Sequence, residues 1–130
     1  MKDISNTLTY RDKDYELVFN FNVLEAIQNE YGTLTQWIEE GYGRRTGEPS
    51  AKALTFMLTE MLNEGIEIKN EDAAPEEQTP PFNRKKVARM LNEIGLENIV
   101  EVIDDTMSKS LQGGEDSKNE LSTKTKKTSR

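Results

Sequence analysis

The first apolar residues of the chain alternate with polar ones, as in a β-strand with one buried face. In residues 15–21 aromatic side chains and leucine recur at every second position, and a polar turn at 11–14 separates this run from residues 7–10. The alternating residues are Tyr15, Leu17, Phe19 and Phe21. The pattern predicts a β-hairpin, and helices must cover it because an isolated two-stranded ribbon is only marginally stable in water.

Two short helices are predicted next, from apolar residues that recur every three or four positions. Asn22 is expected to cap the first helix, and Gly32 is expected to end it. Thr33 or Thr35 is expected to cap the second helix, which stops at Gly41. Each helix presents a short apolar stripe that must be buried against another element.

The clearest helical pattern begins at Ser50 and is expected to end at Gly65. Its apolar residues follow the spacing of a helix with one buried face: Leu54, Met57, Leu58, Met61 and Leu62. Residues 66–82 are rich in acidic side chains and contain three prolines. We therefore expect a long mobile loop over 66–82, because this composition is poorly suited to packing in a core.

Two further amphipathic helices are predicted after this loop. The first follows Asn83 as its cap and ends at Gly95, and the second runs to Leu111. Residues 112–130 are rich in Lys, Ser and Thr, so we predict a disordered tail there. Residues 1–111 are then expected to form a single α+β domain that is mainly α-helical, with an N-terminal β-hairpin followed by about five short amphipathic helices.

The composition narrows the range of functions. Cysteine and histidine are both absent from the 130 residues, which removes disulfides, thiolate metal sites and the commonest metal ligand and general base. The formal net charge of -7 argues against a nucleic-acid partner, since binding phosphates needs clustered basic residues. No run approaches the roughly 20 apolar residues of a membrane span, so we expect a soluble cytoplasmic protein without a membrane partner.

The acidic residues do not suggest catalysis or metal binding. Adjacent pairs such as Asp104 and Asp105 point about 100° apart on a helix and cannot face one substrate together. Asp12, Asp14 and Glu16 lack the central glycine and the final glutamate of a calcium-binding loop. We therefore expect no catalytic residues, no cofactor and no metal, and a protein that is not an enzyme.

Methionines and aromatic side chains are candidates for binding a partner protein. Met57 and Met61 lie on the apolar face of a predicted helix, and methionine both fills cores and adapts to partners of variable shape. Trp37, Tyr42 and Phe82 lie beside predicted loops, and large aromatic residues dominate interface hot spots. For the methionines and Trp37, burial in the core is the simpler explanation.

Basic residues cluster in the first turns of the helix predicted after residue 83, where the helix dipole disfavours positive charge. The cluster consists of Arg84, Lys85, Lys86 and Arg89. One explanation is compensation by the acidic loop that precedes the helix, and the other is docking of an acidic partner. Arg84, Lys85 and Arg89 are therefore candidates for partner binding as well.

The order of these signals resembles a known family. The runs at 15–24 (YELVFNFNVL), 30–38 (EYGTLTQWI) and 54–58 (LTFML) are similar to the pattern of tail assembly chaperones from long-tailed phages and prophages of Gram-positive bacteria. The predicted helix over 103–111, followed by a Gly-rich and Lys-rich tail, is similar to the same family. The resemblance consists of hydrophobic positions with a Tyr-Gly break at 31–32, and it includes no active-site signature.

The resemblance implies a protein that coats the tape measure protein in the host bacterial cytoplasm and recruits major tail tube subunits. Such a protein leaves the finished tail, so it is not expected in the mature virion. Translational frameshifting commonly produces a longer product in this family, and the Lys126 and Lys127 codons are a candidate site for it. Self-association is left open as a further partnership.

Two other functions are compatible with the same residues. A structural component of the head-tail connection or of the tail would have a similar size but would stay in the virion. A small regulatory adaptor would act on a partner unrelated to tails. Both alternatives are binding proteins, so they share the expectation that catalysis is absent.

Overall fold

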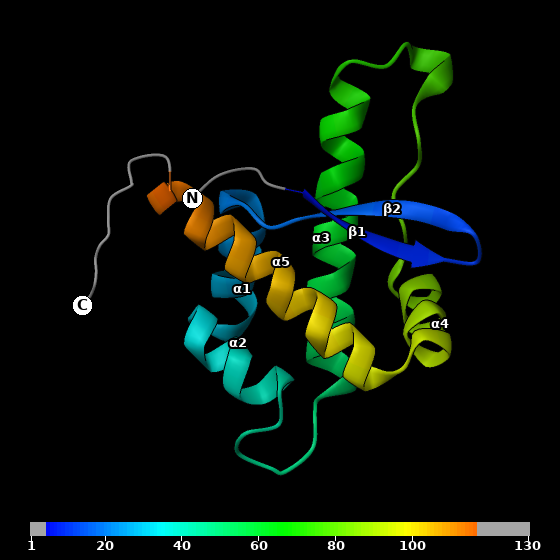
Figure 1. Cartoon of the computed structure of the whole chain (residues 1–130). Helices are drawn as coiled ribbons and strands as arrows, with labels where there is room; N and C mark the ends of the chain where they lie inside the picture. Colours follow the sequence, from blue (N-terminus) through cyan, green and yellow to red (C-terminus); the bar gives the residue numbers. More distant parts are fainter. Residues whose placement is uncertain (1–4, 117–130) are drawn as a thin grey trace.

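Two antiparallel strands and five α-helices make up the computed structural model, which describes the backbone of residues 5–116 and the side chains of residues 5–112. The order confirms the prediction of an N-terminal hairpin followed by five helices (Figure 1). The elements are β1 (Ser5–Tyr10), β2 (Lys13–Val18), α1 (Phe21–Tyr31), α2 (Leu34–Gly41), α3 (Ala51–Glu71), a 3-10 turn (Pro75–Glu77), α4 (Arg84–Ile94) and α5 (Leu96–Asp116). No helix in this described part is long and apolar enough to cross a bilayer.

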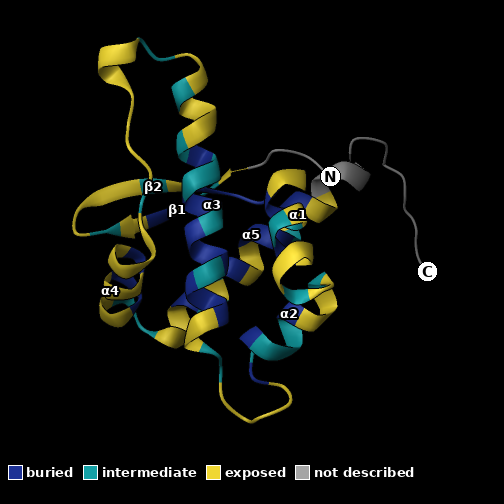
Figure 2. Cartoon of the chain, turned by 180° about the vertical axis from the view of Figure 1, so that it is seen from behind, coloured by how far each residue is buried: buried dark blue, intermediate teal, exposed yellow. Residues whose placement is uncertain are grey.

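The helix α3 is the centre of the molecule. Its buried residues run from Ala53 to Gly65, and β2 and all four other α-helices contact it. Seen from behind in Figure 2, the buried stretch of α3 lies between α4 on one side and α1 and α2 on the other. Because several sides of α3 are covered, the core is one continuous cluster.

The hairpin lies across α3 with one face in the core. Its strands pair Leu8 with Tyr15, and the two-residue turn has positive φ values of 52° at Arg11 and 63° at Asp12. Such a turn matches the right-handed twist of paired strands. Leu8 and Leu17 are buried on the inner face, so the alternation along these strands sets the side that packs on the helices.

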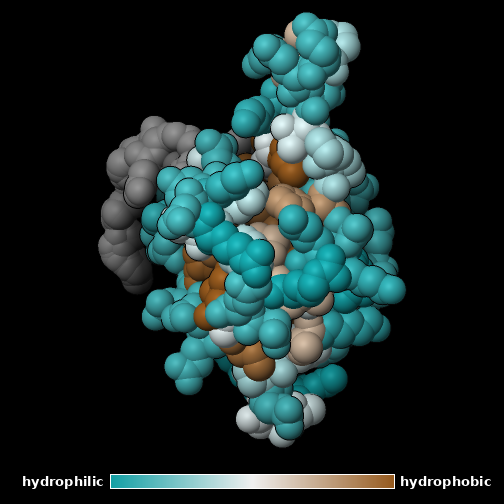
Figure 3. Space-filling view, turned by 90° about the vertical axis from the view of Figure 1, so that its right-hand side faces the viewer, coloured by the Kyte–Doolittle hydropathy of each residue, from teal (hydrophilic) through white to brown (hydrophobic). Residues whose placement is uncertain are grey.

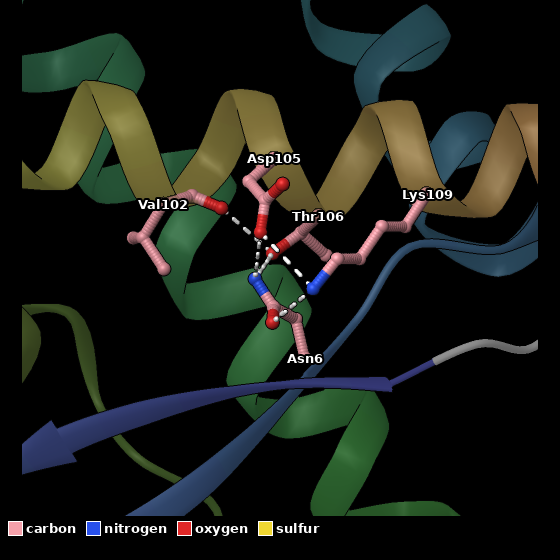
Figure 4. A network of polar contacts seen from close by, with 5 residues as sticks. All are labelled: Asn6, Val102, Asp105, Thr106 and Lys109. Carbon is pink, nitrogen blue, oxygen red and sulfur yellow. Dashed lines mark hydrogen bonds and ion pairs between the residues drawn. The ribbon is translucent and has the colours of Figure 1, made fainter.

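A polar network fastens β1 to α5 (Figure 4). The Asn6 amide donates to Asp105 Oδ2 at 3.1 Å and to Thr106 Oγ1 at 3.0 Å, and its oxygen accepts from Lys109 Nζ at 3.2 Å. The Thr106 hydroxyl donates in turn to the carbonyl of Val102 at 2.7 Å. Both polar atoms of the Asn6 side chain are therefore satisfied, which fixes the start of the hairpin against the last helix.

The end of β2 differs from the prediction. The strand stops at Val18, and Phe21 begins α1 with its side chain 72% exposed instead of on the inner face of the hairpin. Asn20 is the cap of α1, where its Oδ1 accepts from the backbone N–H of Val23, so the predicted cap at Asn22 is wrong. Asn20 is buried and also donates to Glu64 on α3 at 2.8 Å, which ties the capped end of α1 to the core.

The helix α3 also passes beyond its predicted end. Gly65 lies inside the helix, where a Cβ atom would come within 2.8 Å of the carbonyl oxygen of Glu16 on β2. The glycine therefore serves the close approach of a helix to a strand instead of ending the helix. The other predicted caps, at Thr33, Ser50 and Asn83, are confirmed.

The predicted loop over 66–82 consequently begins only after Glu71. Two asparagine side chains hold its return path: Asn70 exchanges two hydrogen bonds of 2.9 Å with the backbone of Thr79, and Asn63 exchanges bonds of 2.8 and 3.0 Å with the backbone of Phe82. Each side-chain amide bonds both the backbone N–H and the backbone carbonyl of one residue, as a neighbouring strand would do. The segment after the 3-10 turn therefore has a fixed course beside α3.

The helix α5 likewise continues past its predicted end at Leu111 and through two glycines to Asp116. A glycine costs only about 1 kcal/mol relative to alanine inside a helix, which does not by itself terminate one. Most of the tail that we predict to be disordered, residues 117–130, lies outside the described residues.

Replacing Asn20 by alanine tests the observed cap. We expect Asn20→Ala to lower the free energy of unfolding by about 1–2 kcal/mol, because it removes a buried cap and the hydrogen bond to Glu64. Asn22→Ala is the matched control, since Asn22 also donates to Glu64 Oε2, at 2.9 Å, but is exposed and does not cap the helix, and it should cost less than about 0.5 kcal/mol. Urea unfolding followed by circular dichroism measures both, and equal losses would contradict the assignment.

Candidate partner-binding site

A groove of about 640 Å³ lies beside β2. It lies between β2, the C-terminal part of α3 and the segment that leads into α4. We call it the apolar groove, and its lining residues are Asp14, Tyr15, Glu16, Leu62, Gly65, Ile66, Ile68, Lys69, Asp72, Thr79 and Phe82. Figure 3 shows apolar surface, brown and tan, directly beneath the hydrophilic protrusion in which α3 ends.

The apolar groove has a hydrophobic floor and a charged rim. Leu62 is buried at its base, Ile66 is half-buried, and Ile68 is 36% exposed. The charged side chains around the floor are Asp14, Glu16, Asp72 and Lys69. Three carboxylates against one ammonium group give the rim a negative balance, which suits an apolar ligand carrying basic residues at its edges.

The local structure holds one wall of the apolar groove in place. The Phe82 ring packs edge-on against the Tyr15 ring, with centroids 5.5 Å apart and planes at 70°. The backbone of Phe82 is held by both atoms of the Asn63 amide. Gly65 brings α3 against the opposite wall at β2. The groove is therefore preformed, which lowers the ordering cost of binding.

A second opening, of about 280 Å³, lies between the tip of the hairpin and α4. We call it the cationic pocket, and its lining residues are Tyr10, Arg11, Lys13, Tyr15, Lys86, Arg89, Met90 and Glu93. Four basic side chains and a single carboxylate surround it, although the chain as a whole carries a net charge of -7. Tyr15 lines both openings, so the pocket and the apolar groove are neighbours.

The one carboxylate of the cationic pocket is already paired. Arg11 Nε donates to Glu93 Oε1 at 3.1 Å, and Arg11 Nη2 donates to Glu93 Oε2. The Tyr10 hydroxyl also donates to Glu93 Oε2, at 2.9 Å. The Arg11 and Tyr10 hydrogen bonds lower the pKa of the Glu93 carboxyl below its ordinary value. The remaining cations, Lys13, Lys86 and Arg89, have no ion pair with any residue in the described part of the chain.

Three of the residues suggested for partner binding lie in the core. Met57, Met61 and Trp37 have no exposed surface, and the Trp37 indole donates to the carbonyl of Ala53 at 2.9 Å. A partner has no access to them in this fold, so they act by packing against α3 and its neighbours. Their burial follows the simpler explanation for these residue types.

Tyr42 connects α2 to α5 instead of lining either opening. Its ring packs edge-on against Trp37, and its hydroxyl donates to Asp104 Oδ1 at 3.0 Å. Burial and then this hydrogen bond raise the pKa of Tyr42 above its ordinary value. The side chain is half-buried, and its hydrogen bond to Asp104 gives it a structural role.

Phe82 and the basic cluster lie where a partner can reach them. Phe82 lines the apolar groove and Arg89 lines the cationic pocket, while Arg84 and Lys85 are exposed in the first turn of α4. The ion pairs found among residues 5–112 are Arg11–Glu93 and Lys109–Asp105. No ion pair among the described residues joins the basic cluster to the acidic loop, so the loop does not compensate it by direct contact.

Most residues that line the two openings are not among the predicted site residues. The prediction places Ile66 and Ile68 in a loop, because it ends the helix at Gly65. The four-residue spacing of Leu58, Leu62 and Ile66 continues across Gly65, and this signal indicates the longer helix. The convergence of the hairpin tip with α4 leaves no local signal in the sequence.

The described residues include no group of three or more His, Cys, Asp or Glu side chains placed to hold a metal ion. Comparison with protein-family models, curated proteins and solved structures finds no match for this chain. The features that bear on function are therefore the apolar groove and the cationic pocket.

The pairing of Glu93 predicts a measurable pH dependence. A carboxyl pKa that is lower in the folded state stabilises the fold above its unfolded value of about 4.3, and this contribution disappears as the pH falls through the lowered pKa. Carboxyl ¹³C NMR titration should place the Glu93 midpoint below that value. Arg11→Gln should raise the midpoint, whereas Lys13→Gln should change it less because Lys13 lines the pocket without bonding Glu93.

Proposed function

We propose that this chain is a tail assembly chaperone of long-tailed phages or prophages, which binds the tape measure protein in the host cytoplasm before the tail is complete. The observation that carries the proposal is the apolar groove, an open hydrophobic surface with a charged rim on a small protein. The resemblance of residues 15–24 and 30–38 to that family supports the same conclusion.

The groove suits one face of an amphipathic helix. Helix-in-groove recognition places apolar residues at three- and four-residue spacing into a hydrophobic cleft. Leu62, Ile66 and Ile68 would contact that apolar stripe, and the carboxylates of Asp14 and Asp72 would face basic residues beside it. A long helical protein such as the tape measure offers many such stripes.

The same geometry supports release from the finished tail. Ile68 keeps about a third of its surface exposed, and Ile66 is half-buried before any client binds. The additional apolar area that one client helix covers is therefore limited, and interfaces of small area are exchanged readily. Many weakly bound copies along one client would keep it soluble and still leave when tail tube subunits assemble around it.

Substituting one exposed residue of the groove tests client binding. Ile68→Glu should weaken binding to the tape measure protein of the same phage about tenfold or more, because it places a charge on the hydrophobic floor. Leu96→Glu is the matched control, since Leu96 is a comparably exposed apolar residue, 42% against 36%, at the start of α5. Co-expression followed by recovery of soluble complex and titration measures both, and equal effects would contradict the groove as the site.

The composition of purified virions tests the role itself. A chaperone should be absent from mature particles or recovered far below stoichiometric amounts, and quantitative mass spectrometry of purified phage measures this. Stoichiometric recovery would instead support a structural component of the tail or of the head-tail connection. Unchanged tail assembly after deletion of the gene would contradict both roles and favour a regulatory adaptor.

A further inference from the structure

The apolar groove and the cationic pocket share a wall. Tyr15 lines both openings, and its ring packs against the Phe82 ring of the groove with centroids 5.5 Å apart. Lys86 lines the pocket, and its Nζ atom lies 5.8 Å from the centroid of the Phe82 ring. The two openings are therefore adjoining parts of one surface, and a ligand that passes Tyr15 extends from one into the other.

The charge of this surface changes sign between its two parts. The rim of the apolar groove has three carboxylates and one ammonium group. In the cationic pocket Lys13, Lys86 and Arg89 are exposed, and none of them forms an ion pair within the part of the chain that the structure describes. Figure 1 shows the hairpin between the protruding end of α3, where Asp72 lies, and α4. The negative part therefore lies toward the end of α3 and the positive part toward α4.

A ligand of uniform charge suits only one part of this surface. A polyanion such as a nucleic acid would be attracted to the pocket but repelled by Asp14 and Glu16 as soon as it passed Tyr15. A uniformly acidic peptide meets the same repulsion, and a uniformly basic helix is repelled by the cations of the pocket. Complementarity along the whole surface requires a ligand whose charge changes sign along its length.

We propose that one segment of the client protein occupies both openings, with an apolar stripe flanked by basic residues in the apolar groove and a short acidic stretch in the cationic pocket. The carboxylates of that stretch would face Lys86 and Arg89, which come from successive turns of α4. This inference rests on the proposed function, because it takes the groove as the client site, and it adds the order of charges that the client must carry.

The cationic pocket then selects among the many apolar stripes of a long client. The groove accepts an apolar stripe with basic residues beside it, but the contacts with Lys86 and Arg89 form only where acidic residues follow the stripe. Basic residues at that position would instead be repelled, which disfavours other registers of the client. The preference should be moderate and sensitive to salt, because exposed charges are screened over about 8 Å at physiological ionic strength.

Two synthetic helical peptides of about 20 residues, roughly 30 Å long, test the proposal. Both carry the same leucine stripe flanked by lysines, and they differ only at one end, where the acidic-end peptide has glutamates and the neutral-end peptide has glutamines. Calorimetric titration of the full chain should show about tenfold tighter binding of the acidic-end peptide. Without the pocket the opposite order is expected, because the net charge of -7 disfavours added negative charge.

Variants of the full chain assign this preference to the pocket. Lys86→Gln with Arg89→Gln should abolish it, because these changes remove the cations that face the acidic end. The matched control, Arg45→Gln with Lys52→Gln, removes two exposed cations outside both openings and should keep it. Raising the salt from about 0.02 M to about 0.5 M should reduce the preference in the wild type. Circular dichroism confirms that each variant is folded.

The outcomes separate this inference from the proposed function. Equal binding of both peptides by the wild type would overturn the inference and leave the groove as a binding site, and so would a preference that survives in the pocket variant. Ile68→Glu should weaken both peptides by a similar factor, because Ile68 lines the groove and not the pocket. Binding of neither peptide would contradict the groove and the inference together.

Discussion

The structure depends on the burial of one helix from several sides. From Ala53 to Gly65 the residues that α3 buries face the hairpin and the other helices, and β2 and the four other α-helices all contact α3. Fully burying a leucine or methionine contributes about 1.5–3 kcal/mol, so Leu54, Met57, Leu58 and Met61 together hold elements that would be marginal alone. The candidate surfaces are then fixed by what remains uncovered around this helix.

Gly65 links the core to the apolar groove. Up to this residue the elements around α3 bury it, and beyond it the helix continues with Ile66 and Ile68 but without a covering element. The absence of a Cβ lets β2 approach within contact distance of the helix. The returning segment is held by Asn63 at the level of Phe82, which closes one side and leaves the other open. The groove is the part of the apolar surface of α3 that the fold does not bury.

The sequence predicted the elements whose signals are local. The hairpin, the caps at Thr33 and Ser50 and the end of a helix at Gly95 follow from two to four neighbouring residues, and the structure confirms them. Gly65 was misassigned because the same glycine can end a helix or admit a neighbouring backbone, and only the strand 49 residues earlier distinguishes the two. Of the candidate site, Phe82 is predicted from its place beside a loop and Arg89 from the basic cluster at a helix start, whereas the convergence of Lys13 with Lys86 depends on tertiary packing alone.

The hydrogen bonds from Asn63 and Asn70 to the returning chain have an evolutionary consequence. Asn63 and Asn70 hold the returning chain by its backbone, so no side chain between 71 and 77 is needed to keep the ends of that segment together. Chain closure between fixed ends changes by only about 0.6 kcal/mol when the intervening length doubles. This tip can therefore gain, lose or exchange residues while the folded body stays the same, so its sequence is able to change independently of stability.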